Sequence, residues 1–160
     1  MPRIPQSLNS SSHLMNFTLA MLETSPAHVY ANTSNVAVAI TACLESAQAC
    51  TSCADSSLAE PDVDALRDCI ALDLNCADIS IATAWVLSRP ALFDRELASS
   101  QLKSCIRACS TCAEECERHA GHHAHCGVCA RACRECASAC QAVVGTEELV
   151  ELSAEDVAPS

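Results

Sequence analysis

The sequence predicts an all-α protein, an antiparallel up-down-up-down four-helix bundle with a short extra N-terminal helix. Ala and Cys are abundant among the 160 residues, whereas Gly numbers only three, Phe two, and Trp and Tyr one each, a composition that favours closely packed helices over sheet. Cysteines recur at steps of three and four, the spacing of one helical face. The joints between the four long segments are short, which makes consecutive helices antiparallel neighbours.

The N-terminal part of the chain predicts one short and one long helix. A polar lead precedes a short amphipathic helix at about residues 13–24, and Pro26 breaks its pattern. The first long helix follows the cap-type residues NTSN (32–35) and runs to about Ser57.

Three further long helices complete the expected bundle. The second covers about residues 61–88 and opens on a proline, which suits the first helical position. The third covers about residues 91–119 and the fourth about 122–144. Gly121 and Gly145 are the expected C-terminal caps of these last two helices.

These elements divide the chain into three parts. The lead and short helix occupy 1–32, the Cys-lined bundle 33–145, and an acidic tail, expected to fray or fold back, 146–160. No run approaches the roughly 20 apolar residues that span a bilayer, so a soluble protein is expected. The apolar run at 14–22 is interrupted by polar residues and followed by no clean cleavage site, which argues against a signal peptide.

Cysteine is the feature that demands a chemical explanation. Fourteen cysteines are several times what a cytosolic protein of this size needs for packing, so redox, cross-linking or metal chemistry must account for them. Each lies on the expected inner face of its helix. In chain order they are Cys43, Cys50 and Cys53; Cys69 and Cys76; Cys105, Cys109, Cys112 and Cys116; and Cys126, Cys129, Cys133, Cys136 and Cys140.

Counting along the four helices from their shared end predicts layers of thiols. Two layers take one cysteine from each helix: Cys50, Cys69, Cys112 and Cys129 form one, and Cys43, Cys76, Cys105 and Cys136 form the other. Successive layers are roughly 5 Å apart at 1.5 Å per residue. An ion with two thiolate bonds of about 2.3 Å spans roughly 4.6 Å between sulfurs, so a bridged column of ions fits.

Five explanations of the cysteines compete. Cys is a small buried hydrophobe, but fourteen on one face exceed what packing needs. Disulfides are awkward between stacked helical neighbours. Zinc usually takes ligands from separated knuckle pairs, and iron–sulfur clusters from loop motifs. Cu(I) fits best, because soft thiolates select it and each bound ion replaces about one thiol proton.

Histidines continue the cysteine stripes at one end. His119 and His122 lie one step beyond the stripes of the third and fourth helices. Imidazole is a common metal ligand, so these residues are expected to capture or pass on metal, although a solvated polar joint is the alternative. The expected order of importance is His122 and His119, then His125, then His123. The opposite end is expected to be apolar and closed by Val36, Ile40, Trp85, Leu87, Phe93 and Leu97.

The cysteine ladders resemble those of the bacterial copper storage proteins of the cytosolic branch. The matching segments, within residues 33–144, are CLESAQACTSC (43–53), CIALDLNC (69–76), CIRACSTCAEEC (105–116) and CGVCARACRECASAC (126–140). The resemblance implies a four-helix bundle that binds many Cu(I) ions in its core, a His-containing open end, a cytoplasmic location and a homotetramer. The chain departs from the densest members by having only five cysteines on its first two helices, where Asp73 interrupts one stripe.

We therefore expect a non-enzymatic protein that sequesters and buffers Cu(I), with a copper chaperone or copper enzyme as a further partner. The alternatives are a thiol redox or oxidant-buffering protein and a zinc-binding Cys-rich bundle. A net charge of −11 with only nine Lys and Arg argues against nucleic acid, and no catalytic motif competes. Met15 and Met21 could add thioethers, and Asp73 a ligand, a water-binding group or a slip in register.

Overall fold

The computed structural model describes residues 17–155 apart from residues 28, 30 and 93, and their side chains up to residue 145 apart from Leu92. Throughout this described part the regular structure is helical. The elements are α1 (Phe17–Glu23), α2 (Thr33–Leu58), α3 (Arg67–Leu87), α4 (Arg95–His119) and α5 (Ala124–Glu155), with 3-10 turns η1 (Val63–Leu66) and η2 (Pro90–Leu92).

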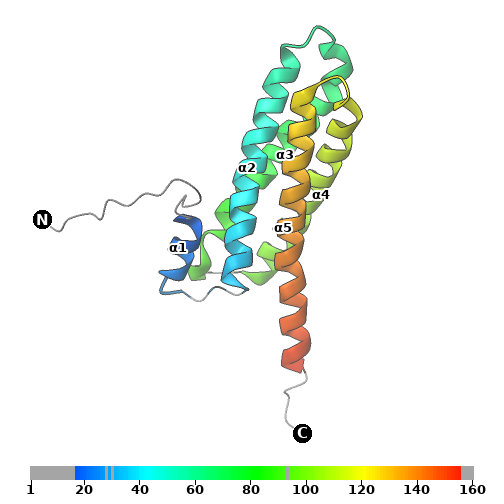
Figure 1. Cartoon of the computed structure of the whole chain (residues 1–160). Coiled ribbons are helices and arrows are strands. Elements are labelled where there is room, and N and C mark those ends of the chain that lie inside the picture. The colour runs from blue at the N-terminus through cyan, green and yellow to red at the C-terminus, as the bar shows by residue number, and fades with distance from the viewer. Residues whose placement is uncertain (1–16, 28, 30, 93, 156–160) are drawn as a thin grey trace, which may run out of the picture.

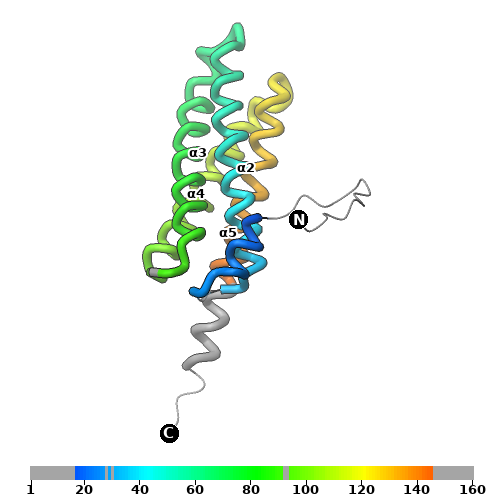
Figure 2. Tube along the Cα trace, turned by 90° about the vertical axis from the view of Figure 1, so that its left-hand side faces the viewer, coloured from blue at the N-terminus to red at the C-terminus, as the bar shows by residue number. Residues whose placement is uncertain are grey.

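Helices α2 to α5 form the predicted antiparallel bundle. Each helix runs opposite to the next (Figure 1), and α2 and α4 each pack against both α3 and α5. Helix α1 lies against the outer side of α2, near the end where α2 begins (Figures 1 and 2). The predicted fold class is confirmed. The α2–α3 and α4–α5 joints lie together at one end of the bundle, and we call this end the mouth.

Side-chain caps fix where two of the helices begin. The Asn32 side chain accepts a hydrogen bond from the Asn35 backbone N–H (3.1 Å), as the NTSN pattern predicts. Asp94 accepts in the same way from the N–H of Leu97 (3.0 Å). Because Asp94 is the cap and Pro90–Leu92 is a separate turn, α4 begins at Arg95 and the expected start near residue 91 is wrong.

Three other expected helix ends are also wrong. Helix α3 begins at Arg67, because the residues before it form the 3-10 turn η1 at the mouth. Helix α5 begins at Ala124, because residues 120–122 form a turn. It also continues through Gly145 to Glu155, beyond the other helices (Figure 1), so residues 146–155 neither fray nor fold back. Good helix formers such as Glu and Leu follow Gly145 and support this continuation.

Large aliphatic side chains close the end of the bundle opposite the mouth. The buried members, which define the closed end, are Val36, Ile40, Leu87, Leu102 and Val143. Trp85 and Leu97, also expected there, are 53% and 54% exposed and lie on the outside, so this part of the expectation is wrong. Phe93 lies outside the described residues. The closed end is therefore apolar, but its seal comes from aliphatic residues.

Two stretches, Thr33–Leu58 and Val63–Leu87, are long and apolar enough to cross a membrane by length and composition alone. Windows of 18 residues within them have mean hydropathies of 1.3 and 1.4, a level that the expectation of no membrane-spanning run did not foresee. Cys and Ala contribute much of the hydropathy, and many of these side chains are buried in the bundle. A core helix of a soluble protein passes the same test, which makes the finding weak evidence for a membrane.

Candidate metal-binding column

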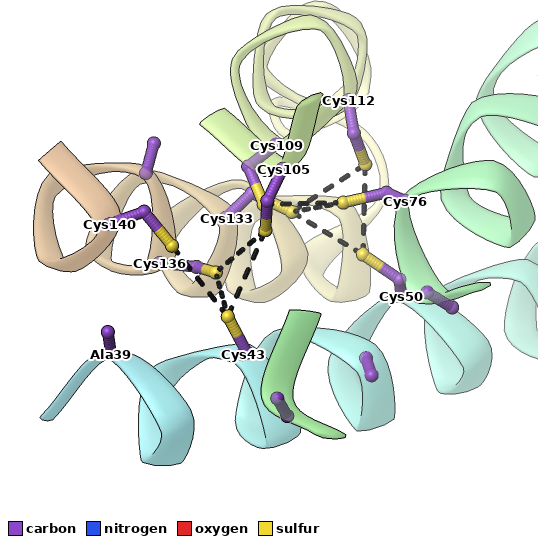
Figure 3. Packing of buried hydrophobic residues seen from close by; sticks show 14 of the residues in the cluster. Ala39, Cys43, Cys50, Cys76, Cys105, Cys109, Cys112, Cys133, Cys136 and Cys140 are labelled. Atoms are coloured by element: carbon purple, nitrogen blue, oxygen red, sulfur yellow. Dashed lines mark hydrogen bonds between the residues drawn. The ribbon is translucent and has the colours of Figure 1, made fainter. Parts of the chain in front are cut away.

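All fourteen cysteines are free and buried, and their sulfurs converge on the axis of the bundle. Nearest the closed end, Cys43 Sγ lies 3.6 Å from Cys136 Sγ, 3.7 Å from Cys140 Sγ and 3.9 Å from Cys105 Sγ. Figure 3 shows these side chains pointing toward one another from α2, α4 and α5. We call these four residues the closed-end group.

A second group lies further toward the mouth and takes one cysteine from each helix. Its members are Cys50, Cys76, Cys112 and Cys133, whose sulfurs all lie within 4.8 Å of one another (Figure 3). Cys50 Sγ and Cys133 Sγ are 3.4 Å apart. Cys109 joins this group through Cys76, at 3.6 Å. Four helices therefore surround a shared set of soft donor atoms.

The column continues to the mouth through further overlapping groups. One contains Cys53, Cys69 and Cys126, and another combines Cys53, Cys116 and Cys129 with Asp73. The structure thus brings together all fourteen cysteines that the sequence predicted to share the interior.

Each predicted four-thiol layer contains the wrong residue from α3. Asp73, and not Cys69, meets Cys50, Cys112 and Cys129, whereas Cys69 lies closer to the mouth. Likewise Cys76 joins the second group instead of the closed-end group. The cause is that α3 begins at Arg67 and not at Pro61, because η1 precedes it at the mouth. Each α3 residue therefore lies nearer the mouth than the sequence predicted.

Asp73 is fully buried among the thiols. Its Oδ1 accepts hydrogen bonds from the S–H groups of Cys112 (3.0 Å), Cys116 (3.4 Å) and Cys129 (3.3 Å). The α3 stripe therefore does not slip at this position. A carboxylate oxygen here faces the same space as the neighbouring sulfurs and is placed to serve as an additional ligand.

Hydrogen bonds between thiols distribute the protons of the column unevenly. Bonds from Cys112, Cys129 and Cys133 lower the pKa of Cys50 to about 6. Bonds led by the one from Cys112 also lower the pKa of Cys116 to about 6. Conversely, donation to Cys116 leads the contributions that raise the pKa of Cys112, and burial raises the pKa of Cys126. Both protonated thiols and readily formed thiolates are thus present.

Three imidazoles gather at the mouth, each held by a carboxylate. His125 Nδ1 lies 3.4 Å from Cys53 Sγ and 3.5 Å from Cys126 Sγ, and its Nε2 lies 3.3 Å from Glu60 Oε1. The His123 ring is 5.7 Å from that of His125 and 6.4 Å from that of His119. A carboxylate on one ring nitrogen orients the other nitrogen for a metal.

The carboxylate partners of the other two imidazoles also belong to the joints or to α4. His123 Nδ1 lies 3.3 Å from Glu60 Oε1 and its Nε2 3.4 Å from Asp62 Oδ2. His119 Nε2 lies 3.0 Å from Glu115 Oε1. The sequence alone did not assign Glu60 and Asp62 to the mouth, because both belong to a turn whose path helical periodicity does not predict.

The histidines occupy places other than those that the extrapolated stripes predict. His122 is exposed in the turn before α5 and does not continue the stripe, whereas His123 is buried with 8% exposure. Among the histidines that the structure describes, only His125 lies within hydrogen-bond distance of cysteine sulfurs. The expectation failed because it treated residues 122 and 123 as helical. Met21 is 70% exposed on α1, and Met15 lies outside the described residues.

Two buried hydroxyl residues inside the column were missed. Ser46 and Ser80 are both fully buried, and each lies within 4.0 Å of three cysteine sulfurs. The available signal was their position at three residues after Cys43 and four after Cys76.

Comparison with known proteins identifies relatives that share this architecture. The copper storage protein family (Csp) matches residues 32–145. An uncharacterised cysteine-rich protein of Bacillus subtilis, YhjQ, is 34% identical over 90 residues, which cover 56% of this chain and 78% of that protein.

Two solved structures of Ccsp from Streptomyces lividans are also similar. The copper storage protein loaded with 10 copper equivalents is 45% identical, with a TM-score of 0.79 over 81% of this chain and 98% of that one. A cytosolic copper storage protein with five coppers is 48% identical, with a TM-score of 0.69 over 70% and 93%. Because the family match covers most of the chain, including all fourteen cysteines, the chain belongs to the copper storage protein family.

Proposed function

We propose that this protein stores Cu(I) along the axis of its bundle, at about one ion per core thiol. The observation that carries the proposal is the column of fourteen free, buried thiols, whose sulfurs approach one another at 3.4 to 3.9 Å across the helices. A bridging ion with two thiolate bonds needs up to about 4.6 Å between its sulfurs, so small side-chain rotations admit it.

Proton exchange keeps the loaded interior close to neutral. Each Cu(I) ion forms a bond to a sulfur whose S–H bond breaks, and the proton leaves to solvent, so the charge inside changes little. Without this exchange a column of buried thiolates would be prohibitively costly. The proposed ligands are the fourteen cysteines together with Asp73, whose carboxylate replaces a thiol on α3.

The mouth is the proposed route for copper. His125 presents Nδ1 to Cys53 and Cys126 while Glu60 holds its Nε2, so an incoming ion can be passed from imidazole to thiolate. His119 supplies a second ligand at the rim, and exposed His122 a first point of capture. The aliphatic closed end offers no comparable donors among the described residues.

The cellular setting is proposed from the relatives. A cytoplasmic location follows the description of the Streptomyces protein as cytosolic, and a homotetramer follows the family resemblance. A copper chaperone or copper enzyme is the proposed partner for exchange, and the protein itself acts without catalysing a reaction.

Anaerobic titration of the reduced protein with Cu(I), beside a strong competing chelator, tests the proposal. We expect on the order of 14 tightly held ions, since each thiol contributes about one. Protein whose thiols have been alkylated after unfolding is the control and should hold none of them. Binding of only one or two ions would favour the thiol redox function, and tetrahedral zinc retained through purification would favour a zinc bundle.

A further inference from the structure

Two hydroxyl groups interrupt the ring of thiols at the middle of the column. Ser46 Oγ, from α2, lies 3.7 Å from Cys133 Sγ, 3.8 Å from Cys109 Sγ and 4.0 Å from Cys76 Sγ. At this level α3, α4 and α5 each supply a thiol, and α2 supplies an alcohol. Cys and Ser differ by one atom, so the fourth sulfur of this layer is replaced by oxygen.

Ser80 on α3 makes the same replacement at the next level toward the closed end. Its Oγ lies 3.6 Å from Cys109 Sγ, 3.8 Å from Cys105 Sγ and 3.9 Å from Cys76 Sγ. Cys105 belongs to the closed-end group, whereas Cys76 and Cys109 belong to the second group. The two groups meet at Cys105 and Cys109, whose sulfurs are 4.0 Å apart, and Ser80 lies beside both.

These hydroxyls are directed into the column, unlike other hydroxyls of the same helices. Thr41 and Thr51 on α2 and Thr83 on α3 each donate to the carbonyl four residues earlier. The hydroxyl groups of Ser46 and Ser80 lie instead within hydrogen-bond distance of cysteine sulfurs. Both side chains are fully buried, so solvent does not account for their orientation.

Cu(I) discriminates strongly between the two atoms. A thiolate is a soft donor that Cu(I) selects, whereas a neutral alcohol is a hard, weak ligand that does not give up its proton at neutral pH. In the loaded column the thiols have lost their protons, and each alcohol can donate a hydrogen bond to a thiolate beside it. An ion moving between the two groups therefore crosses a level with fewer ligands.

Resting on the proposed storage function, we propose that Ser46 and Ser80 form a hydroxyl belt that divides the copper column into a mouth-side store and a separate closed-end store. Copper reaches the closed-end group only past this belt, because aliphatic side chains seal the far end. The closed-end store fills last and empties last. The belt also sets capacity, since two levels of the column each lack one thiol.

Withdrawal of copper from fully loaded protein by excess chelator, under anaerobic conditions, tests the belt. We expect two phases, with a slow phase of about four ions, one for each closed-end thiol. In the double variant Ser46→Cys/Ser80→Cys we expect about two more ions and release in one phase, because the missing ligands are restored.

Two control variants separate the belt from the number of thiols. Ser46→Ala/Ser80→Ala also lacks soft ligands there and should retain both phases and the original capacity. Ser104→Cys adds a thiol on the exposed side of α4, where Ser104 donates to the Ser100 carbonyl, and should add no chelator-resistant ion. Circular dichroism of the reduced proteins establishes that each variant is folded.

Single-phase release from the wild type, or no added capacity in the double Cys variant, would overturn the belt. Either result with about 14 ions bound leaves the storage function intact. A wild type that binds only one or two ions contradicts the storage function itself, so the two failures are distinguishable.

Discussion

The two ends of the column use similar thiols in opposite surroundings. At the mouth, Cys53 and Cys126 face His125, which is 21% exposed and held by a carboxylate. At the closed end, the four sulfurs of the closed-end group lie behind aliphatic side chains. Thiolates alone can hold Cu(I), whereas transfer of the ion between the column and solvent needs ligands that are exposed to water. This asymmetry supports the proposal that copper both enters and leaves the column at the mouth.

Acidification should produce the largest effect, and it should differ along the column. Burial raises the pKa of Cys126, and donation to its neighbours raises that of Cys112, so these thiols are protonated at neutral pH and below. Copper must displace their protons, and affinity should fall about tenfold per ion for each pH unit, or about 1,000-fold from pH 8 to 5.

Cys50 should behave differently, because hydrogen bonds from Cys112, Cys129 and Cys133 lower its pKa to about 6. The Cys50 thiol gives up its proton more readily than the thiols of Cys112 and Cys126, so the affinity of the ion bound there should depend less steeply on pH above about pH 6. Competition titrations at several pH values measure both effects. Uniform affinity across this range would contradict proton displacement as the basis of binding.

Truncation at the closed end should reduce stability while leaving copper capacity unchanged. Leu102 is fully buried there, and Leu102→Ala should lower the free energy of unfolding of the copper-free protein by about 2–5 kcal/mol. Denaturant unfolding measures the loss, and Leu97→Ala on the exposed side of the same helix is the control. A loss below about 0.5 kcal/mol would show that Leu102 does not seal the bundle.

Asp73→Asn should weaken copper binding between the two ends. The amide keeps the shape of the carboxylate but removes its charge, and we expect a 10- to 100-fold loss of affinity for about one ion. Asp68→Asn, on the exposed side of α3, is the matched control. Wild-type affinity for every ion would exclude Asp73 from the ligands.

Loss of the mouth imidazoles should have the smallest effect at equilibrium. His119→Ala/His125→Ala should slow loading and release by about tenfold, because the groups that pass copper to the thiols are missing, with capacity nearly unchanged. Stopped-flow transfer from a Cu(I)–chelator complex measures the rate, with Ser104→Ala on the exposed side of α4 as the control. Unaltered rates in the double variant would remove the role of the imidazoles.

Periodicity predicted the interior well and the joints poorly. Cys105 to Cys116 and Cys126 to Cys140 lie in uninterrupted helices, so steps of three and four placed their sulfurs on one face. Cys69 and Cys76 were assigned to the wrong layers because the path of residues 59–66 depends on tertiary packing rather than on local pattern. The same limitation reversed the expected places of His122 and His123.

Oxygen atoms within the column were the other features that pattern alone could not assign. Asp73 lay on the expected stripe, but its contacts with three thiols depend on how far α3 is shifted along its neighbours. Ser46 and Ala47 are adjacent on α2 and both are buried, so periodicity does not decide which of them faces the axis. Which of two adjacent residues faces the axis depends on helix rotation, which packing decides.

Anomalous diffraction at the copper edge from crystals of the loaded protein would locate the bound ions. We expect copper ions along the bundle axis, each bridging sulfurs from at least two helices, with a change in spacing beside Ser46 and Ser80. Copper confined to surface carboxylates and imidazoles, around an interior of metal-free thiols or disulfides, would contradict this expectation.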